Sequence, residues 1–132
     1  MGFALSIVTP EGQAYAGEVD GIVLPGVEGD FGVLPEHERF LTPLRVGAVE
    51  IMTGSSAVLA AVSGGFADVQ GDQVTVLADS CELSDEIDVA RADEARALAE
   101  EALAGAEDAE RAAEYQASLA RARNRIEVGG RS

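Results

Sequence analysis

Glycine and proline are unevenly distributed along the chain, and this limits what each part of it can form. The 132 residues include 15 glycines and four prolines. Up to residue 80, short apolar runs alternate with Gly, Pro and Asp. From residue 84 onward there is no proline, and Gly105 is the only glycine between residues 72 and 128. Because glycine and proline interrupt helices, the first part favours strands and turns, and the second part favours helices.

The first part has the pattern of an all-β domain. Its β-type segments are FALSIV, VDGIVLPG, FGVLP, VGAVEIM, AVLAAV, FADV and VTVLAD. They recur about every 8–12 residues, which predicts an antiparallel sandwich or barrel. In the last segment, Val74, Val76 and Ala78 point to one face, whereas Thr75 and Leu77 point to the other. Apolar residues on both faces predict that this strand is at least partly covered on both sides.

The second part is rich in Ala, Glu, Arg and Leu and predicts a helical hairpin. Gly105 divides it into two helices of roughly 20 residues each. The predicted apolar stripe of the second helix comprises Ala112, Tyr115, Leu119, Ala122 and Ile126, and that of the first comprises Ala95, Leu98 and Ala102. Alanine buries little apolar area, so we expect a weakly held element that a ligand can move. The alternative is a stable helical cap.

Charge and composition exclude several classes of function. The formal charge of −15 repels phosphate backbones, so the sequence predicts no direct nucleic-acid binding. All nine basic residues are arginine, which removes chemistry that needs a lysine amine. With Cys81 as the only cysteine, neither an intramolecular disulfide nor a thiolate metal cluster is expected. No apolar run approaches the ~18 residues of a membrane span, and the N-terminus lacks a signal-peptide pattern, so we expect a cytoplasmic protein without direct membrane insertion.

Two short motifs superficially resemble enzyme sites. The segment GVEGDFG, residues 26–32, suggests a phosphate loop, but no GK[ST] follows it, so turns are the favoured interpretation. The segment AVSGG, residues 61–65, approaches the nucleophile elbow of hydrolases. However, Ala61 replaces the first glycine, a strand is expected to follow, and His37 is the only histidine that could act as a base. A single histidine also builds no usual metal site, and we expect a protein that is not an enzyme.

Five strings in order carry a family resemblance. They are PGVEGDFGVLPEH (25–37), SGGFADV (63–69), VTVLAD (74–79), IDVARA (87–92) and RARNRIEV (121–128). Together they closely resemble the epsilon-subunit family of bacterial F-type ATP synthases, over nearly the whole chain. The resemblance implies a β-sandwich of about ten strands over residues 1–81. It also implies a regulatory antiparallel two-helix hairpin over residues 82–132.

The resemblance implies a mechanical role without catalysis. Such subunits belong to the central stalk, bind the gamma subunit and the membrane rotor ring of c subunits, and couple the ring to the catalytic head during proton-driven ATP synthesis. Their extended hairpin meets the alpha and beta subunits and inhibits ATP hydrolysis. The resemblance also implies that no cofactor is required and that the subunit is peripheral, at the cytoplasmic face of the bacterial cell membrane, as part of the ATP synthase complex. The implied rotor-ring and gamma interface includes Glu28, Asp30, Phe31 and His37.

In several relatives ATP is a regulatory ligand that holds the hairpin folded, and the resemblance places this site around IDVARA. Ile87 and Ala92 would border adenine, Asp88 and Glu82 would accept from its amine, and Arg91, Arg121 and Arg125 would bind phosphates. Leu98 stands where these relatives are expected to carry a further arginine.

A purely structural interpretation of IDVARA stays open beside the nucleotide site. Ser84 or Asp85 would cap the helix, and the carboxylate of Asp88 in the first turn would interact favourably with the positive end of the helix dipole. Arg91 would pair with Asp88 or Asp93. The second helix also begins with four acidic residues, which would repel an acidic partner surface and weaken inhibition. They are Glu107, Asp108, Glu110 and Glu114, against only Arg111.

Overall fold

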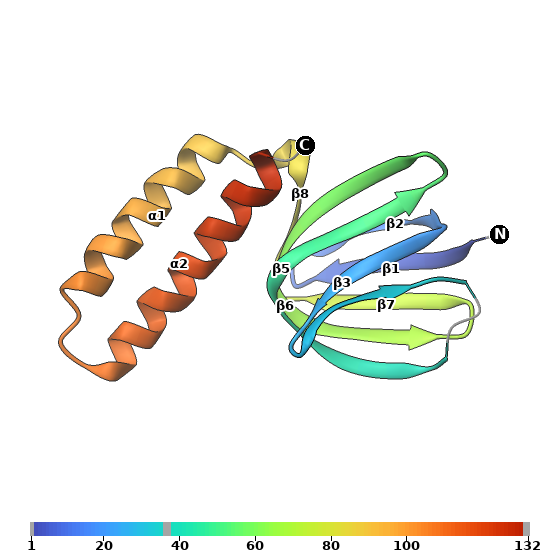
Figure 1. The fold of residues 1–132 in the computed structure, drawn as a ribbon, viewed down its shortest axis with the longest axis horizontal. Coiled ribbons are helices and arrows are strands. Elements are labelled where there is room, and N and C mark those ends of the chain that lie inside the picture. Colours follow the sequence, from blue (N-terminus) through green and yellow to red (C-terminus); the bar gives the residue numbers. More distant parts are fainter. Residues whose placement is uncertain (1, 36–37, 131–132) are drawn as a thin grey trace.

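Eight strands build the first part of the chain in the computed structural model, which describes residues 2–35 and 38–130. They are β1 (Phe3–Thr9), β2 (Gly12–Val19), β3 (Gly21–Gly26), β4 (Gly29–Val33), β5 (Phe40–Thr53), β6 (Ser56–Gln70), β7 (Gln73–Ala78) and β8 (Cys81–Leu83). The predicted sandwich is confirmed (Figure 1). The described strands number eight rather than about ten because β5 and β6, with 14 and 15 residues, each curve from one layer into the other.

The strands are hydrogen-bonded in the order β2-β1-β7-β6-β5-β3-β4, and β8 pairs with β6. Among the described residues, β1 and β7 form the single parallel pair, with Leu5 opposite Val74 and Ile7 opposite Val76. This pair departs from the predicted antiparallel arrangement because β1 and β7 are joined not by a tight turn but by all the intervening strands. β1 and β7 therefore pair inside the sheet, between β2 and β6.

The core lies between the two layers of the sandwich. Leu5, Ile7, Ile22, Leu24 and Ile51 are among its fully buried side chains. In β7 the predicted alternation is confirmed on the inner face, where Val74 and Val76 are fully buried. On the outer face Thr75 is half-buried and Leu77 is 53% exposed, so this face is covered only in part.

A two-helix hairpin follows the sandwich, as predicted. The elements are a short 3₁₀ turn, η1 (Ser84–Glu86), then α1 (Val89–Ala104) and α2 (Ala109–Gly130). Gly105 ends α1, and its backbone N–H donates to Glu101 O. The cap that begins α1 is Asp88, whose Oδ1 accepts from Arg91 N at 3.1 Å. The predicted caps, Ser84 and Asp85, lie instead in η1.

The two helices pack through the predicted face of α2 but not that of α1. In α2, Leu119 and Ala122 are buried. In α1, the buried residues are Ala92 and Ala99, whereas Leu98 is 67% exposed. The predicted stripe Ala95, Leu98 and Ala102 is therefore wrong. The reason is that α1 carries alanines on every side, so its apolar periodicity fits more than one face.

Ion pairs add to the stability of α1 and to its contact with α2. Arg96 forms ion pairs with Asp93 and Glu100 at 2.9 and 2.8 Å, and Arg123 of α2 reaches Glu100 at 3.4 Å. In Figure 1, α2 lies between α1 and the sandwich, so α2 is the helix that docks. None of the helices in residues 2–35 and 38–130 combines the length and apolar character needed to cross a bilayer.

Candidate functional site at the hairpin interface

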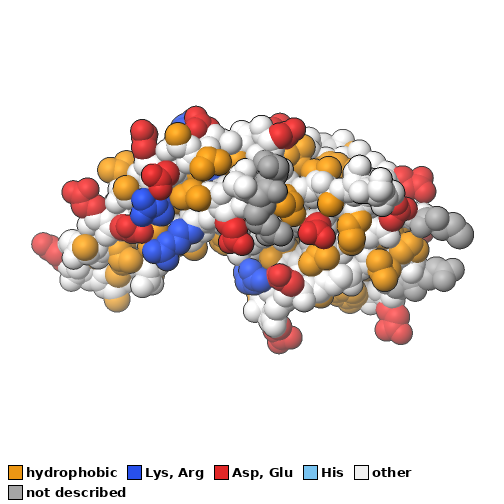
Figure 2. All heavy atoms as spheres, turned by 45° about the horizontal axis from the view of Figure 1, so that its top comes forward, with side chains coloured by type: hydrophobic (Ala, Val, Ile, Leu, Met, Phe, Trp, Pro, Cys, Tyr) orange, Lys and Arg blue, Asp and Glu red, His pale blue; other side chains and the backbone are white. Residues whose placement is uncertain are grey.

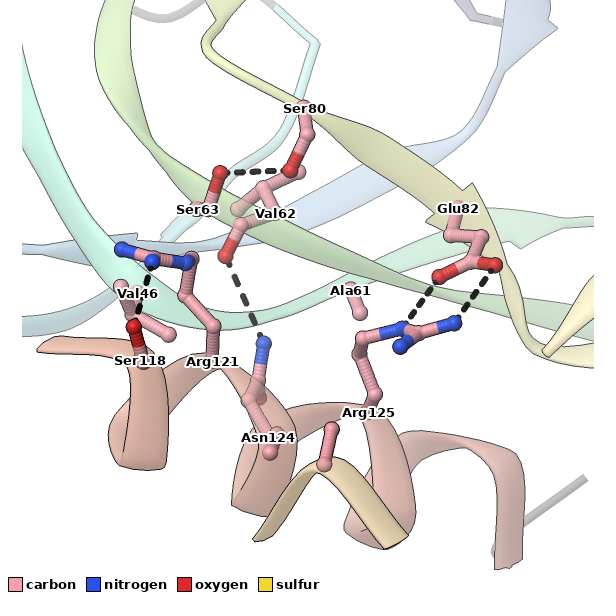
Figure 3. A pocket seen from close by; sticks show the side chains of 12 residues that line it. Val46, Ala61, Val62, Ser63, Ser80, Glu82, Ser118, Arg121, Asn124 and Arg125 are labelled. Carbon is pink, nitrogen blue, oxygen red and sulfur yellow. Dashed lines mark hydrogen bonds and ion pairs between the residues drawn. The ribbon is translucent and has the colours of Figure 1, made fainter. Parts of the chain in front are cut away.

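A cavity of about 340 Å³ lies between α2 and the outer surface of the sandwich (Figure 3). This volume is at the lower end of the range typical of ligand pockets. The apolar part of its wall is formed by Val46, Ala61 and Val62 of β5 and β6, and by Ala95 and Ala122 of the hairpin. Ala61 is 5% exposed because the hairpin covers it. The cavity therefore depends on the docked position of the hairpin.

An ion pair closes one end of the cavity. Arg125 Nε donates to Glu82 Oε1 at 2.7 Å, and Nη2 donates to Oε2 at 3.2 Å. Glu82 stands on β8, which is held in place because it pairs with Ala61 of β6. Hydrogen bonding to Glu82 raises the pKa of the Arg125 guanidinium, and Asp88 adds a smaller charge effect in the same direction. The forked geometry joins the sandwich to α2 at a defined orientation.

Asn124 fastens the middle of the same interface. Its Nδ2 donates to Gly47 O of β5 at 2.8 Å and to Val62 O of β6 at 3.4 Å. Gly47 and Val62 are cross-strand partners, so one amide bridges both central strands. Asn124 is not among the site residues predicted from the sequence. A possible signal was its place as the sole uncharged polar residue in RARNRIEV, between Arg123 and Arg125.

The end of α2 packs against the segment that leads into α1. Val128 is fully buried. A methyl group added at Gly129 would lie 2.7 Å from Val89 Cγ2 and 3.1 Å from Ile87 Cγ2, so a larger residue would push the two segments apart. The start and the end of the hairpin are thus held together at the point where the chain leaves the sandwich.

The other end of the cavity contains hydroxyl groups and a guanidinium. Arg121 Nη2 donates to Ser118 Oγ at 3.1 Å. Within residues 2–35 and 38–130, no carboxylate forms an ion pair with Arg121. Ser63 and Ser80 line the sandwich side, and their hydroxyls are hydrogen-bonded to each other (Figure 3). Sequence reasoning gave no signal for these serines as a group.

The predicted nucleotide residues divide into two sets. Glu82, Arg121 and Arg125 line the cavity together. The other four lie at the hinge: Asp88 caps α1, Arg91 is exposed, Ile87 is half-buried and Ala92 is buried. The predicted pairing of Arg91 with Asp88 takes the form of a backbone N–H to carboxylate bond, which belongs to the cap. Three of the seven predicted residues therefore line the cavity, and Asp88 caps the helix that follows.

The predicted rotor-facing residues lie on the β3–β4 hairpin. Gly26 and Gly29 pair across its turn, so GVEGDFG forms a turn between strands and no helix follows it. Glu28 is exposed, and Asp30 forms an ion pair with Arg45. Phe31 packs edge-on against Phe40, with ring centroids 5.5 Å apart. His37 lies outside the described residues.

Exposed apolar side chains gather on the outer face of the sandwich away from the hairpin. Leu41, Phe66 and Leu77 are 67%, 51% and 53% exposed, and Phe66 is the cross-strand partner of both Pro43 and Leu77. We call these four residues the apolar patch. Figure 2 shows hydrophobic side chains at the surface of the sandwich, acidic side chains scattered over the whole face, and arginine side chains mainly over the hairpin.

Comparisons with known proteins agree along the whole chain. Residues 2–84 match the family model described as ATP synthase, Delta/Epsilon chain, beta-sandwich domain, and residues 85–130 match the long alpha-helix domain of the same family. The chain is 47% identical to the ATP synthase epsilon chain of Halalkalibacterium halodurans, covering 96% of both. It is 46% identical to that of Syntrophobacter fumaroxidans, covering 94% of this chain and 92% of the relative.

A solved structure has the same fold. A chain in the mitochondrial ATP synthase of Euglena gracilis superposes with a TM-score of 0.83 at 22% identity, covering 96% of this chain and 79% of that one. At this identity the likeness concerns the fold.

Proposed function

This chain belongs to the delta/epsilon chain family of the ATP synthase, and we propose that it is a non-catalytic rotor subunit of the central stalk. In this role its sandwich, residues 1–81, binds the gamma subunit and the membrane ring of c subunits. It couples the ring to the catalytic head during proton-driven ATP synthesis at the cytoplasmic face of a bacterial cell membrane. The hairpin, residues 82–132, regulates ATP hydrolysis. The division after residue 81 falls within β8.

The apolar patch supports a protein partner on the sandwich. Large apolar side chains that are exposed side by side on several strands are typical of protein interfaces. We assign the patch to gamma, and the exposed β3–β4 turn with Glu28 and Asp30 to the rotor ring. Phe31 would support that turn through its contact with Phe40, and His37 completes the proposed interface by sequence alone.

Mixing the chain with gamma tests this assignment. We expect one-to-one association by size-exclusion chromatography with light scattering, and loss of at least tenfold in affinity for Phe66→Ser, since interface aromatics commonly contribute more than about 1.4 kcal/mol. Leu98→Ser is the control, because Leu98 is also a large exposed apolar residue, at 67% against 51% for Phe66, but lies on the hairpin. Equal affinity of the two variants would contradict the assignment.

The observation that supports a movable hairpin is that α2 meets the sandwich through a short polar seam. Asn124 and Arg125 provide the hydrogen bonds, and Ala122 is buried beside the cavity. A seam of this kind is worth a few kcal/mol, which partner binding can offset. Once released, the hairpin would reach the alpha and beta subunits. The acidic start of α2 would limit its attraction to any acidic surface there.

Hydrolysis by the reconstituted complex tests the regulatory role. We expect Asn124→Ala to favour the released hairpin and to lower the rate of ATP hydrolysis relative to the unmodified chain. A chain that ends at Glu86 should give the uninhibited rate. If all three complexes hydrolyse ATP equally fast, the hairpin does not regulate hydrolysis.

A second function, ATP sensing, is favoured by the chemistry of the cavity. A carboxylate stands at one end, an arginine without a carboxylate partner among the described residues stands at the other, and apolar groups lie between. A nucleotide needs this order of groups, with acceptors near its amine and donors near its phosphates. Because the walls belong to both the sandwich and α2, ATP would favour the docked hairpin, with Asp88 and Arg91 at the hinge beside it.

Calorimetric titration of the isolated chain with ATP tests this function. We expect saturable binding. Arg121→Ala should weaken it about tenfold, because one charge-assisted hydrogen-bond donor is lost. Arg111→Ala is the control, because Arg111 lies on α2 but outside this cavity. Arg91→Ala shows whether the hinge takes part. No binding at millimolar ATP would exclude the sensor and leave the stalk role intact.

A further inference from the structure

Ser63, in the motif that resembles a nucleophile elbow, is held at the cavity by an unusual backbone. The next two residues, Gly64 and Gly65, have φ angles of 94° and 119°, which residues with side chains rarely adopt. They lie where Leu44 pairs with Gly65 and Val46 pairs with Ser63, and the register of β5 against β6 is the same on both sides of Gly64. Glycine adopts such angles without steric cost, so the course of β6 beside Ser63 depends on these two glycines.

Ser80 is brought to Ser63 by the same local structure. Ser63 N donates to Ser80 O at 3.2 Å, and Asp79 N donates to Gly64 O at 3.3 Å. The two hydroxyls are hydrogen-bonded to each other and both line the cavity. Only one hydroxyl proton is needed for that bond, so the pair keeps one donor and further acceptor sites. The sandwich therefore presents two fixed hydroxyls to the hairpin.

The hairpin presents a positive charge to the same cavity. Arg121 bonds to Ser118 through Nη2, which leaves the other guanidinium N–H groups available. Its neighbour Arg125 is neutralised by Glu82 at the opposite end. The net positive charge of the cavity therefore lies at Arg121 (Figure 3). Hydroxyls together with a guanidinium form a donor set suited to a phosphate group.

We propose that Ser63 and Ser80 bind a phosphate group of the nucleotide together with Arg121, so that the phosphate links the sandwich to the hairpin. This assignment rests on the proposed ATP-binding function and names groups of the sandwich that act in it. A phosphate between the two walls contacts both of them only when the hairpin is docked. Its binding energy therefore favours the docked state, which is the condition for a ligand to shift the equilibrium.

Substitution of the serines tests the proposal. In calorimetry with ATP we expect Ser63→Ala and Ser80→Ala to weaken binding about tenfold, since a hydrogen bond to a charged group is lost. Ser63→Thr keeps the hydroxyl and should restore most of the affinity. Ser56→Ala is the control, because Ser56 is exposed at the start of β6 and does not line the cavity. Thermal unfolding by circular dichroism checks that each variant is folded.

Phosphorus NMR at saturating ATP identifies which part of the ligand is affected. We expect Ser63→Ala to shift the phosphorus signals of bound ATP and to leave the adenine proton signals in place. If Ser63→Ala binds ATP like the unmodified chain while Arg121→Ala does not, the serine assignment is overturned and the ATP site stands. If adenine and phosphorus signals shift alike, Ser63 shapes the cavity and the assignment is also overturned. If the unmodified chain binds no ATP, both proposals fail.

Discussion

Replacement of Asn124 by alanine should release the hairpin without unfolding the sandwich. The change removes the amide that donates to Gly47 O at 2.8 Å and to Val62 O at 3.4 Å. The first bond has ordinary length and is worth about 1 kcal/mol, and the second is near the geometric limit and is worth less. We therefore expect the docked state to lose about 1–2 kcal/mol, which raises the undocked population about 5–30-fold.

Hydrogen exchange followed by mass spectrometry measures this population. Undocked helices of this length are marginal in water, so amides of α2 lose protection when the hairpin leaves the sandwich. In Asn124→Ala we expect exchange in α2 to quicken about 5–30-fold, while the paired strands β5 and β6 keep their rates. Gln116→Ala is the matched control, since it removes an exposed amide from the same helix.

Two results would refute this reasoning. If Asn124→Ala and Gln116→Ala exchange at the same rate, the two hydrogen bonds contribute nothing to docking. If β5 and β6 exchange faster together with α2, Asn124 stabilises the whole fold rather than the docked hairpin. The latter outcome would also remove the structural basis for a separately movable hairpin.

Three further predictions concern the scaffold and the hinge. Gly65→Ala should lower the free energy of unfolding by about 3 kcal/mol in denaturant titrations, because its methyl group would lie 2.0 Å from Leu77 O. Gly71→Ala is the control: Gly71 faces open space, so this change should alter the free energy of unfolding by less than about 0.5 kcal/mol. Asp88→Ala should cost about 1 kcal/mol through the lost cap, seen as a lower melting temperature; an unchanged melting temperature would contradict the cap. Burial raises the pKa of the Cys81 thiol to about 11 from 9.0, with help from nearby carboxylates. Alkylation at pH 8 should therefore be about 100-fold slower than in the unfolded chain. Since the folded pKa is the higher one, stability should decline as the pH rises from 9.0 to about 11, and equal alkylation rates would disprove the shift.

Most of the fold could be predicted because its periodicities are strong. The alternation of Val74 and Val76 and the spacing of Leu119 and Ala122 each identify one buried face. The buried face of α1 could not be predicted, because alanines lie on every side of this helix and each buries little apolar area. Leu98 was expected at the helix contact but is mostly exposed.

The candidate site was only partly visible in the sequence. Glu82 and Arg125 were named through the family resemblance, and they meet in an ion pair across 43 residues of chain. The hydroxyl pair of Ser63 and Ser80 depends on two positive-φ glycines and on contact between segments distant in the sequence, neither of which has a sequence period. Asn124 donates to backbone carbonyl groups, which every residue has. No residue type therefore marks its partners in the sequence.

The parallel pairing of β1 with β7 has a consequence for biosynthesis. Residues 4–8 are paired with residues 73–77, so the sheet cannot be completed until more than half of the chain has been synthesised. We expect a chain that ends at Asp72 to lack cooperative thermal unfolding, and a sharp transition in that fragment would contradict this. The hairpin is synthesised after the sandwich, so it meets strands that are already available. The strands of the sandwich are therefore synthesised before the helices that pack on them.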